Sequence, residues 1–272
     1  MTALVKRGVK TCALTVVGLL CAGIVSAEMT TDGIIAYWPM EDDIDIEDVF
    51  GGNHGVPSGD GDIDVVKGHV GNALEFDGTA EVLVDGTDAL NLAGAESFSV
   101  SVWANAEYDP DDDDAAKQQP VVGVVEGCCG SMVAQRDVNG WALRYDGRNA
   151  GLEMEFIVHD GGWQGDGGFG APLPAAGEWH HYVGVLDDGT TRFYFDGELQ
   201  MEGVAGAVAS IGSETDIGHA GDGGFVGIID EVAIYSIALS DKQVRANFES
   251  PGLSVDPVGK LATEWASLKG LR

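Results

Sequence analysis

Apolar and polar residues alternate along most of the chain between Met29 and Tyr235. Strict alternation places the apolar side chains on one face of an extended strand. No convincing helical period interrupts this pattern, so the region predicts an all-β fold with many antiparallel strands. The clearest predicted strands are residues 34–40, 97–107, 180–187 and 227–235.

Asp-Gly pairs recur between the alternating segments and predict tight turns. Both residues accept a positive φ, and Asp-Gly between two apolar alternations is a strong hairpin signal. The best predicted hairpin is 190–202, where two strands flank Asp196-Gly197. Two further hairpins are predicted over 73–84 and 141–158.

The two ends of the chain differ from this β-rich region. Basic residues (Lys6, Arg7, Lys10) precede an apolar run over 11–25 and small residues up to Ala27, which predicts a signal peptide over 1–27. The alternative is an uncleaved anchor, although the run is short for a bilayer span. We therefore expect a secreted or extracellular protein whose mature chain does not span a membrane, with the periplasm or the cell surface as alternatives.

Beyond the strands, Ser240 and Gln243 form a capping-box pattern that predicts a short helix ended by Pro251-Gly252. The mature chain is then one domain over 28–250, followed by a tail over 251–272. The apolar spacing of the tail favours a helix, and a frayed terminus is the alternative.

The charge of the chain restricts its partners. It carries 45 Asp+Glu against 14 Lys+Arg, a formal charge of −31. Such a surface repels nucleic acid and anionic lipid, so we expect neither as a partner. It suits cation binding, although a solvated acidic surface accounts for most of the charge.

A buried acid pair is predicted near the end of the domain. The alternation of Ile228, Val232 and Ile234 places Asp230 on the same, core-facing side of a strand, and Glu231 follows at once. A carboxylate directed at a core is costly unless it is compensated. The pattern therefore indicates a catalytic acid pair, a metal site or a misread strand.

Catalytic signals are weak elsewhere. Residues 43–47 alternate Asp43, Asp45 and Glu47 with isoleucine, which is similar to the Glu-x-Asp-x-Glu run of laminarinase-type glycosidases, but the first position is Asp. The chain contains no GxSxG, HExxH or CxxC run. The vicinal His180 and His181 would point to opposite faces of a strand and cannot chelate one metal ion together. We assign no catalytic residue.

Cys128 and Cys129 are the cysteines that remain once the predicted signal peptide is removed. Adjacent Cα atoms lie closer together than normal disulfide geometry prefers. In an exported protein a vicinal disulfide is one reading, and two reduced, packed thiols are the other.

Two glycine-rich loops carry candidate ligand-binding aromatics. Trp163 and Phe169 lie in the loop over 159–170, and a second such loop covers 218–225. A flat aromatic ring can stack on a sugar, and the alternative is a ring that only pins its loop to the sandwich. The acidic segment 108–114 indicates either a second cation site or a solvated loop.

Six segments in order resemble LamG-like jelly-roll domains of the concanavalin A-like lectin/glucanase superfamily, which is related to the pentraxins. The resemblance covers about residues 30 to 245, and it departs from the family at Phe50 and in an insertion over 108–130. The segments are YWPMEDD, DVFGGNHGV, GNALEFDG, SFSVSVWANAE, GEWHHYVGVLDDGTTRFYFDGEL and GIIDEVAIYSIALS.

The resemblance implies a two-sheet antiparallel jelly-roll β-sandwich with a structural Ca²⁺ near one edge. In such folds the Asp of the Ile-Asp-Glu strand meets the N-terminal acidic loop across the ion, and hard oxygen ligands suit Ca²⁺. The alternative is Asp230 capped by backbone N–H groups without metal. The implied ligands are the carboxylates of Asp230, Asp48 and Glu41, the amide oxygen of Asn53 and the carbonyl of Gly51.

The sequence thus predicts an exported, non-catalytic recognition domain, stabilised by calcium, that binds a glycan or an extracellular protein. A glycoside hydrolase of the glucanase type and a structural or adhesion module of the cell surface are the alternatives.

Overall fold

The computed structural model describes residues 27–114, 117–123, 128–136, 139–148, 153–165, 170–212, 214–221, 223–250 and 252–253. The predicted signal peptide up to residue 26, Phe169 and almost all of the predicted tail lie outside these residues. Within the described part, no helix has both the length and the apolar character that crossing a membrane would need.

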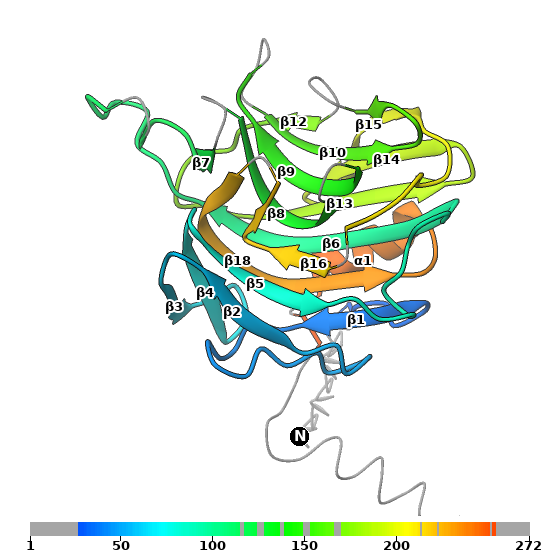
Figure 1. Cartoon of the computed structure of the whole chain (residues 1–272), viewed down its shortest axis with the longest axis horizontal. Helices are drawn as coiled ribbons and strands as arrows, with labels where there is room; N and C mark the ends of the chain where they lie inside the picture. The colour runs from blue at the N-terminus through cyan, green and yellow to red at the C-terminus, as the bar shows by residue number, and fades with distance from the viewer. Residues whose placement is uncertain are drawn as a thin grey trace, which may run out of the picture.

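Two antiparallel sheets stack face to face and form the predicted β-sandwich (Figure 1). The larger sheet follows the order β15-β14-β13-β6-β18-β4-β3, and β1, β7 and β17 also pair with β18. Its strands are β1 (Ile34–Trp38), β3 (Ile63–Lys67), β4 (Asn72–Asp77), β6 (Ser97–Ala106), β7 (Val121–Gly123), β13 (Trp179–Asp187), β14 (Thr190–Phe195), β15 (Glu198–Val204), β17 (His219–Ala220) and β18 (Gly223–Tyr235).

The smaller sheet follows the order β11-β10-β9-β8-β16-β5-β2, and β12 also pairs with β10. Its strands are β2 (Gly55–Gly59), β5 (Ala80–Asp85), β8 (Cys128–Arg136), β9 (Gly140–Asp146), β10 (Glu153–His159), β11 (Trp163–Gln164), β12 (Gly170–Pro172) and β16 (Glu214–Ile217).

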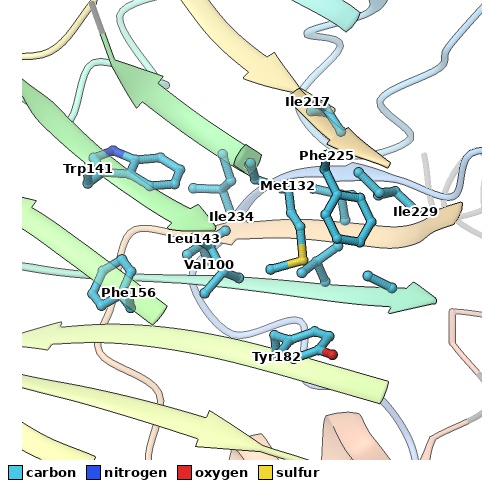
Figure 2. Packing of buried hydrophobic residues seen from close by; sticks show 14 of the residues in the cluster. Val100, Met132, Trp141, Leu143, Phe156, Tyr182, Ile217, Phe225, Ile229 and Ile234 are labelled. Carbon is cyan, nitrogen blue, oxygen red and sulfur yellow. The ribbon is translucent and has the colours of Figure 1, made fainter. Parts of the chain in front are cut away.

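The hydrophobic core lies between the two sheets, and Figure 2 shows its centre. Alternate residues of each strand enter it, as the sequence pattern predicts: Trp141 and Leu143 from β9 meet Val100 from β6 and Ile234 from β18. Large rings fill the layer, and all of these side chains are buried. Burial of apolar area on this scale is the main stabilising contribution to the fold.

The turns explain which predicted hairpins form. Asp188-Gly189 joins β13 to β14 and Asp196-Gly197 joins β14 to β15, and both residues of each pair have a positive φ. This is the backbone that a two-residue hairpin turn needs, and the hairpin predicted over 190–202 is confirmed.

The hairpin predicted over 73–84 is wrong. β4 pairs within the larger sheet, whereas β5 pairs within the smaller one, so the segment crosses from one sheet to the other. At Asp77-Gly78 only the glycine has a positive φ. The Asp77 carboxylate instead accepts hydrogen bonds from the backbone of Thr79 and Ala80, which turns the chain into the second sheet.

The short helix α1 (Asp241–Glu249) begins where the sequence predicts, with a capping box between Ser240 and Gln243. Its apolar side carries Val244, which packs against Tyr235 and Val183 on the outer face of the larger sheet. The helix therefore covers one part of that face (Figure 1).

A β-bulge in β18 changes the predicted direction of Asp230. The register shifts between Asp230 and Ala233, and Glu231 has a φ of 53°. The extra residue breaks the period of two, so Val232 shares the core with Ile229, while Ile228 does not enter it. The prediction that Asp230 faces the core is wrong: it lies opposite Trp103 and points to the outer face of the larger sheet.

Candidate functional site

Asp48 is the centre of a hydrogen-bonded loop. Its Oδ1 accepts from the backbone N–H groups of Tyr37 (2.9 Å), Phe50 (2.9 Å) and Gly51 (3.0 Å). Its Oδ2 accepts from the backbone (2.9 Å) and the side-chain amide (2.7 Å) of Asn53. These donors compensate the charge of the buried carboxylate. The structure thus brings Asp48, Gly51 and Asn53 together.

Asp230 and Glu41 lie at a different loop, between β3 and β4. Asp230 Oδ2 accepts from Val70 N (3.0 Å), and Glu41 Oε2 accepts from Asn72 N (3.0 Å). A Cβ added at Gly68 would lie 2.6 Å from Asp230 Oδ2, and a Cβ at Gly71 would lie 2.2 Å from Glu41 Oε1. The glycine-rich loop therefore packs its backbone directly against both carboxylates.

Glu231 completes a buried acidic group beside Asp230. The Tyr37 hydroxyl donates a hydrogen bond to Glu231 Oε2, while Oε1 is buried without a hydrogen-bond partner. Burial raises the pKa of Asp230 to about 7 and that of Glu231 to about 8, and the nearby Glu41 carboxylate raises both further. The site therefore disfavours negative charge unless a cation is close.

The sequence-predicted calcium ligands thus fall into two groups. Glu41 and Asp230 share the 68–72 loop, whereas Asp48, Gly51 and Asn53 form the neighbouring hub in which the Asp48 oxygens already accept five N–H bonds. Hard carboxylate oxygens and glycine-freed carbonyls suit Ca²⁺, so the first group fits the ion and the second does not.

The acidic run over 43–47 does not form an alternating strand. Residues 43–45 are bends, and Ile46 makes an isolated bridge to Gly55. Ile44 is 73% exposed, which shows that the segment lies on the surface. This placement lacks the paired, inward-facing carboxylates that glycoside hydrolysis requires.

Trp163 lies on the outer face of the smaller sheet. Its half-buried ring packs against a floor of small apolar residues on β8, β9, β10 and β17. The Arg136 guanidinium carbon lies 4.6 Å from the ring centroid, and the His159 ring meets the indole edge-on at 5.1 Å. The floor comprises Ala134, Ala142, Ile157 and Ala220.

An open depression of about 410 Å³ adjoins this aromatic residue. A second depression of about 280 Å³ adjoins the first, because Glu214 lines both. The second is lined by Thr87, Asn91 and Gln135 among other residues. The first is lined by Glu81, Leu83, Arg136, Glu214, Asp216, His219, Ala220 and Gly221.

The sequence analysis missed the charged residues of this face. Glu81, Arg136 and Asp216 do lie on strand positions opposite to core residues, and that alternation is readable from the sequence. The analysis assigned binding to loop aromatics instead, and no local signal shows that separate strands bring these side chains to one depression.

A buried ion network lies on β9 and β10 of the same sheet. Arg144 contacts Glu155 at 2.7 Å and Asp146 at 3.3 Å, and Arg148 contacts Asp146 at 2.7 Å. Opposite Asp146 in the β8–β9 ladder lies Cys128, which is joined to Cys129 by a vicinal disulfide. The structure thus has the oxidised of the two forms considered for this pair.

Solved structures with the same fold are binding domains. Domain 4 of AbnA, an extracellular arabinanase from Geobacillus stearothermophilus solved with arabinotriose, aligns with a TM-score of 0.59 at 20% identity, covering 78% of this chain and 96% of that domain. The binding domain of Paraclostridial Mosquitocidal Protein 1 aligns with a TM-score of 0.59 at 16% identity, covering 79% of this chain and 52% of that one.

The binding domain of botulinum neurotoxin DC, solved with rat synaptotagmin II, aligns with a TM-score of 0.57 at 14% identity. This match covers 82% of the chain and 52% of the toxin domain, so the chain spans about half the length of these toxin domains. At such identities the likeness concerns the fold alone.

Sequence comparison assigns the family. No curated protein matches the chain. The Laminin_G_3 family model, described as concanavalin A-like lectin/glucanases superfamily, matches residues 76–245. This match covers more than half of the chain and agrees with the sandwich, so the chain belongs to the concanavalin A-like lectin/glucanase superfamily.

Proposed function

We propose that this protein is an exported, non-catalytic domain that binds carbohydrate on the outer face of its smaller sheet. The observation that carries the proposal is the co-location of Trp163, Arg136 and three carboxylates at one open depression. Sugar sites combine apolar contact for the ring faces with a few convergent polar groups that fix orientation.

The chemistry of the depression supports this assignment. Glu81, Glu214 and Asp216 can each accept hydrogen bonds from sugar hydroxyls, and Arg136 can donate them. Trp163 and Leu83 offer apolar surface. Because Glu214 lines both adjoining depressions, the surface suits a glycan chain better than a single sugar.

The charge of the surface favours a neutral glycan. Three carboxylates face one arginine in the larger depression, on a chain of net charge −31. A uronic acid or sulfated sugar would meet like charge, which lowers both its affinity and its rate of association.

We also propose that a structural Ca²⁺ stabilises the domain at Glu41 and Asp230. The support is the donor set of the 68–72 loop: two carboxylates, glycine carbonyls and a buried acid pair whose charge disfavours the apo form. A bound cation would compensate that charge and join the N-terminal segment to β18.

The experiment is a panel of neutral and anionic polysaccharides, tested by affinity electrophoresis and calorimetry, with an assay for released reducing ends. Binding to a neutral polysaccharide without release supports the proposal. Arg136→Gln should weaken binding at least tenfold, because it removes a charged donor from the depression. Arg192→Gln is the matched control, since Arg192 lies on the larger sheet and pairs with Asp187 and Glu202.

The other outcomes separate the alternatives. Release of reducing ends would indicate a glycoside hydrolase of the glucanase type. Absence of binding to every polysaccharide would contradict the carbohydrate proposal and favour a protein partner or an adhesion role at the cell surface.

A further inference from the structure

We propose that Cys128, Cys129 and Asp146 form a redox-controlled site for a soft divalent cation, such as Zn²⁺. The site is closed while the two cysteines are joined as a disulfide, and it forms when they are reduced. The proposal is independent of the carbohydrate-binding function and of the calcium site, because it uses different residues and a different class of metal ligand.

The geometry of the three side chains carries the proposal. One atom from each of them, the two sulfurs and an Asp146 carboxylate oxygen, lies within 4.8 Å of the other two. Among the described residues this is the one group of three or more His, Cys, Asp or Glu side chains that approach so closely. All three residues are buried.

Hydrogen bonds hold the carboxylate ligand in place. Asp146 Oδ1 accepts from Arg148 N at 2.8 Å, and Oδ2 contacts Arg148 Nη2 at 2.7 Å. Although burial disfavours its charge, these bonds from Arg148 keep the pKa of Asp146 below its usual range. Outer partners of this kind orient metal-binding carboxylates and tune their affinity.

Charge balance explains why the oxidation state would control the site. In the oxidised form Asp146 and Glu155 face Arg144 and Arg148, so two negative charges meet two positive ones. Two thiolates would add two uncompensated negative charges to a buried cluster, which is unfavourable. One divalent cation restores the balance.

The chemistry of the switch is a thiol–disulfide exchange followed by metal binding. A dithiol reductant supplies two electrons and two protons, the Cys128–Cys129 bond breaks, and the reductant becomes a disulfide. The two thiols then bind one cation and release two protons. The nearby guanidinium groups of Arg144 and Arg148 favour the thiolates. Thiolate sulfur selects Zn²⁺ or Cd²⁺ over Ca²⁺.

The test uses the full chain and Cd²⁺ as the probe, in excess Ca²⁺ to occupy hard acidic sites. Untreated protein should give no thiolate-to-cadmium absorption band. After reduction with a phosphine, which is then removed, the protein should bind one Cd²⁺ per chain with that band. Cys128→Ser and Cys129→Ser should each abolish the band, and Asp146→Asn should weaken binding about 10–100-fold. Glu47→Gln, an exposed acid, is the control and should change nothing.

Three results would overturn the proposal. The first is a reduced protein that binds no Cd²⁺, or that binds it equally well without either cysteine. The second is a folded protein whose cysteines stay resistant to alkylation after reductant, since a switch must be reducible in the folded chain. The third is free thiols in the untreated protein, which would remove redox control. Circular dichroism of each variant confirms folding before the comparison.

Discussion

The guanidinium carbon of Arg136 lies 4.6 Å from the centroid of the Trp163 ring, although two strands, β9 and β10, separate β8 from β11 in the sheet. The arginine thus reaches along the outer face toward the indole. The pair fixes one wall of the proposed binding surface, because each side chain limits the freedom of the other.

Replacement of Trp163 by alanine should weaken carbohydrate binding by about 1–3 kcal/mol, the contribution of a large aromatic anchor. Stability should fall as well, because the half-buried ring packs on the floor around Ala134 and Ile157. Calorimetric titration and chemical denaturation measure the two effects separately.

Two further variants interpret that result. Trp163→Phe keeps an aromatic ring and should retain more of the binding than alanine. Phe50→Ala removes an exposed aromatic side chain (46% exposed) near Asp48 and should leave affinity unchanged. A loss of stability with unaltered affinity in Trp163→Ala would show that the indole only pins its loop.

Chelation should lower the melting temperature by several degrees if Ca²⁺ binds at Glu41 and Asp230. Only the folded chain assembles these ligands, so calcium at a hundredfold excess over Kd adds about 2.7 kcal/mol to the free energy of unfolding. Scanning calorimetry with and without chelator checks this, and Mg²⁺ should restore the protein poorly because it prefers a tighter octahedral shell.

The matched variants for calcium are Asp230→Asn and Asp48→Asn. Asp230→Asn should make the melting temperature insensitive to chelator, whereas Asp48→Asn should destabilise the loop hub yet keep the sensitivity. A melting temperature unmoved by chelator, once elemental analysis confirms that the metal has left, would falsify the calcium proposal.

Stability should fall as the pH drops below about 6.5, in part because of His181. Burial lowers the pKa of His181 to about 3, and its Nε2 lies 2.8 Å from Ser101 Oγ. The unfolded chain takes up a proton near pH 6.5 that the folded chain refuses until about pH 3. The contribution of His181 is therefore full above pH 6.5 and is lost by about 1.4 kcal/mol per pH unit below it.

The variant His181→Gln isolates this contribution from that of the many carboxylates. Denaturation at pH 7 and pH 5 should give a smaller difference for the variant than for the wild type. Equal differences in the two proteins would show that the folded chain protonates His181 as readily as the unfolded chain does.

Gly184→Ala should destabilise the core by about 1–3 kcal/mol through overpacking. A Cβ at this position would lie 2.3 Å from a ring carbon of Phe156, which is itself fully buried. Gly206→Ala is the control, because its Cβ would come no closer than 3.5 Å to Asp160. Urea denaturation of the two variants measures the difference, and equal stability would contradict the tight packing of β13 on β10.

The sequence by itself determined the fold class, most strand positions, the hairpin at Asp196-Gly197 and the capped helix after Ser240. These features depend on local chemistry: alternation defines a buried face, two positive φ values define a two-residue turn, and a capping box satisfies the first N–H groups of a helix. The resemblance to the superfamily came from the same local segments.

The tertiary structure alone decided where the chemistry-bearing side chains meet. A single bulge at Glu231 moved Asp230 from the core to the outer face, because one inserted residue reverses every later position of a strand. Strand order brought Arg136 to Trp163 and Cys128 opposite Asp146, across gaps in the sequence that carry no local signal. Strand pairing is a long-range choice made by packing the whole sandwich, so the depression and the buried ion network became visible only in three dimensions.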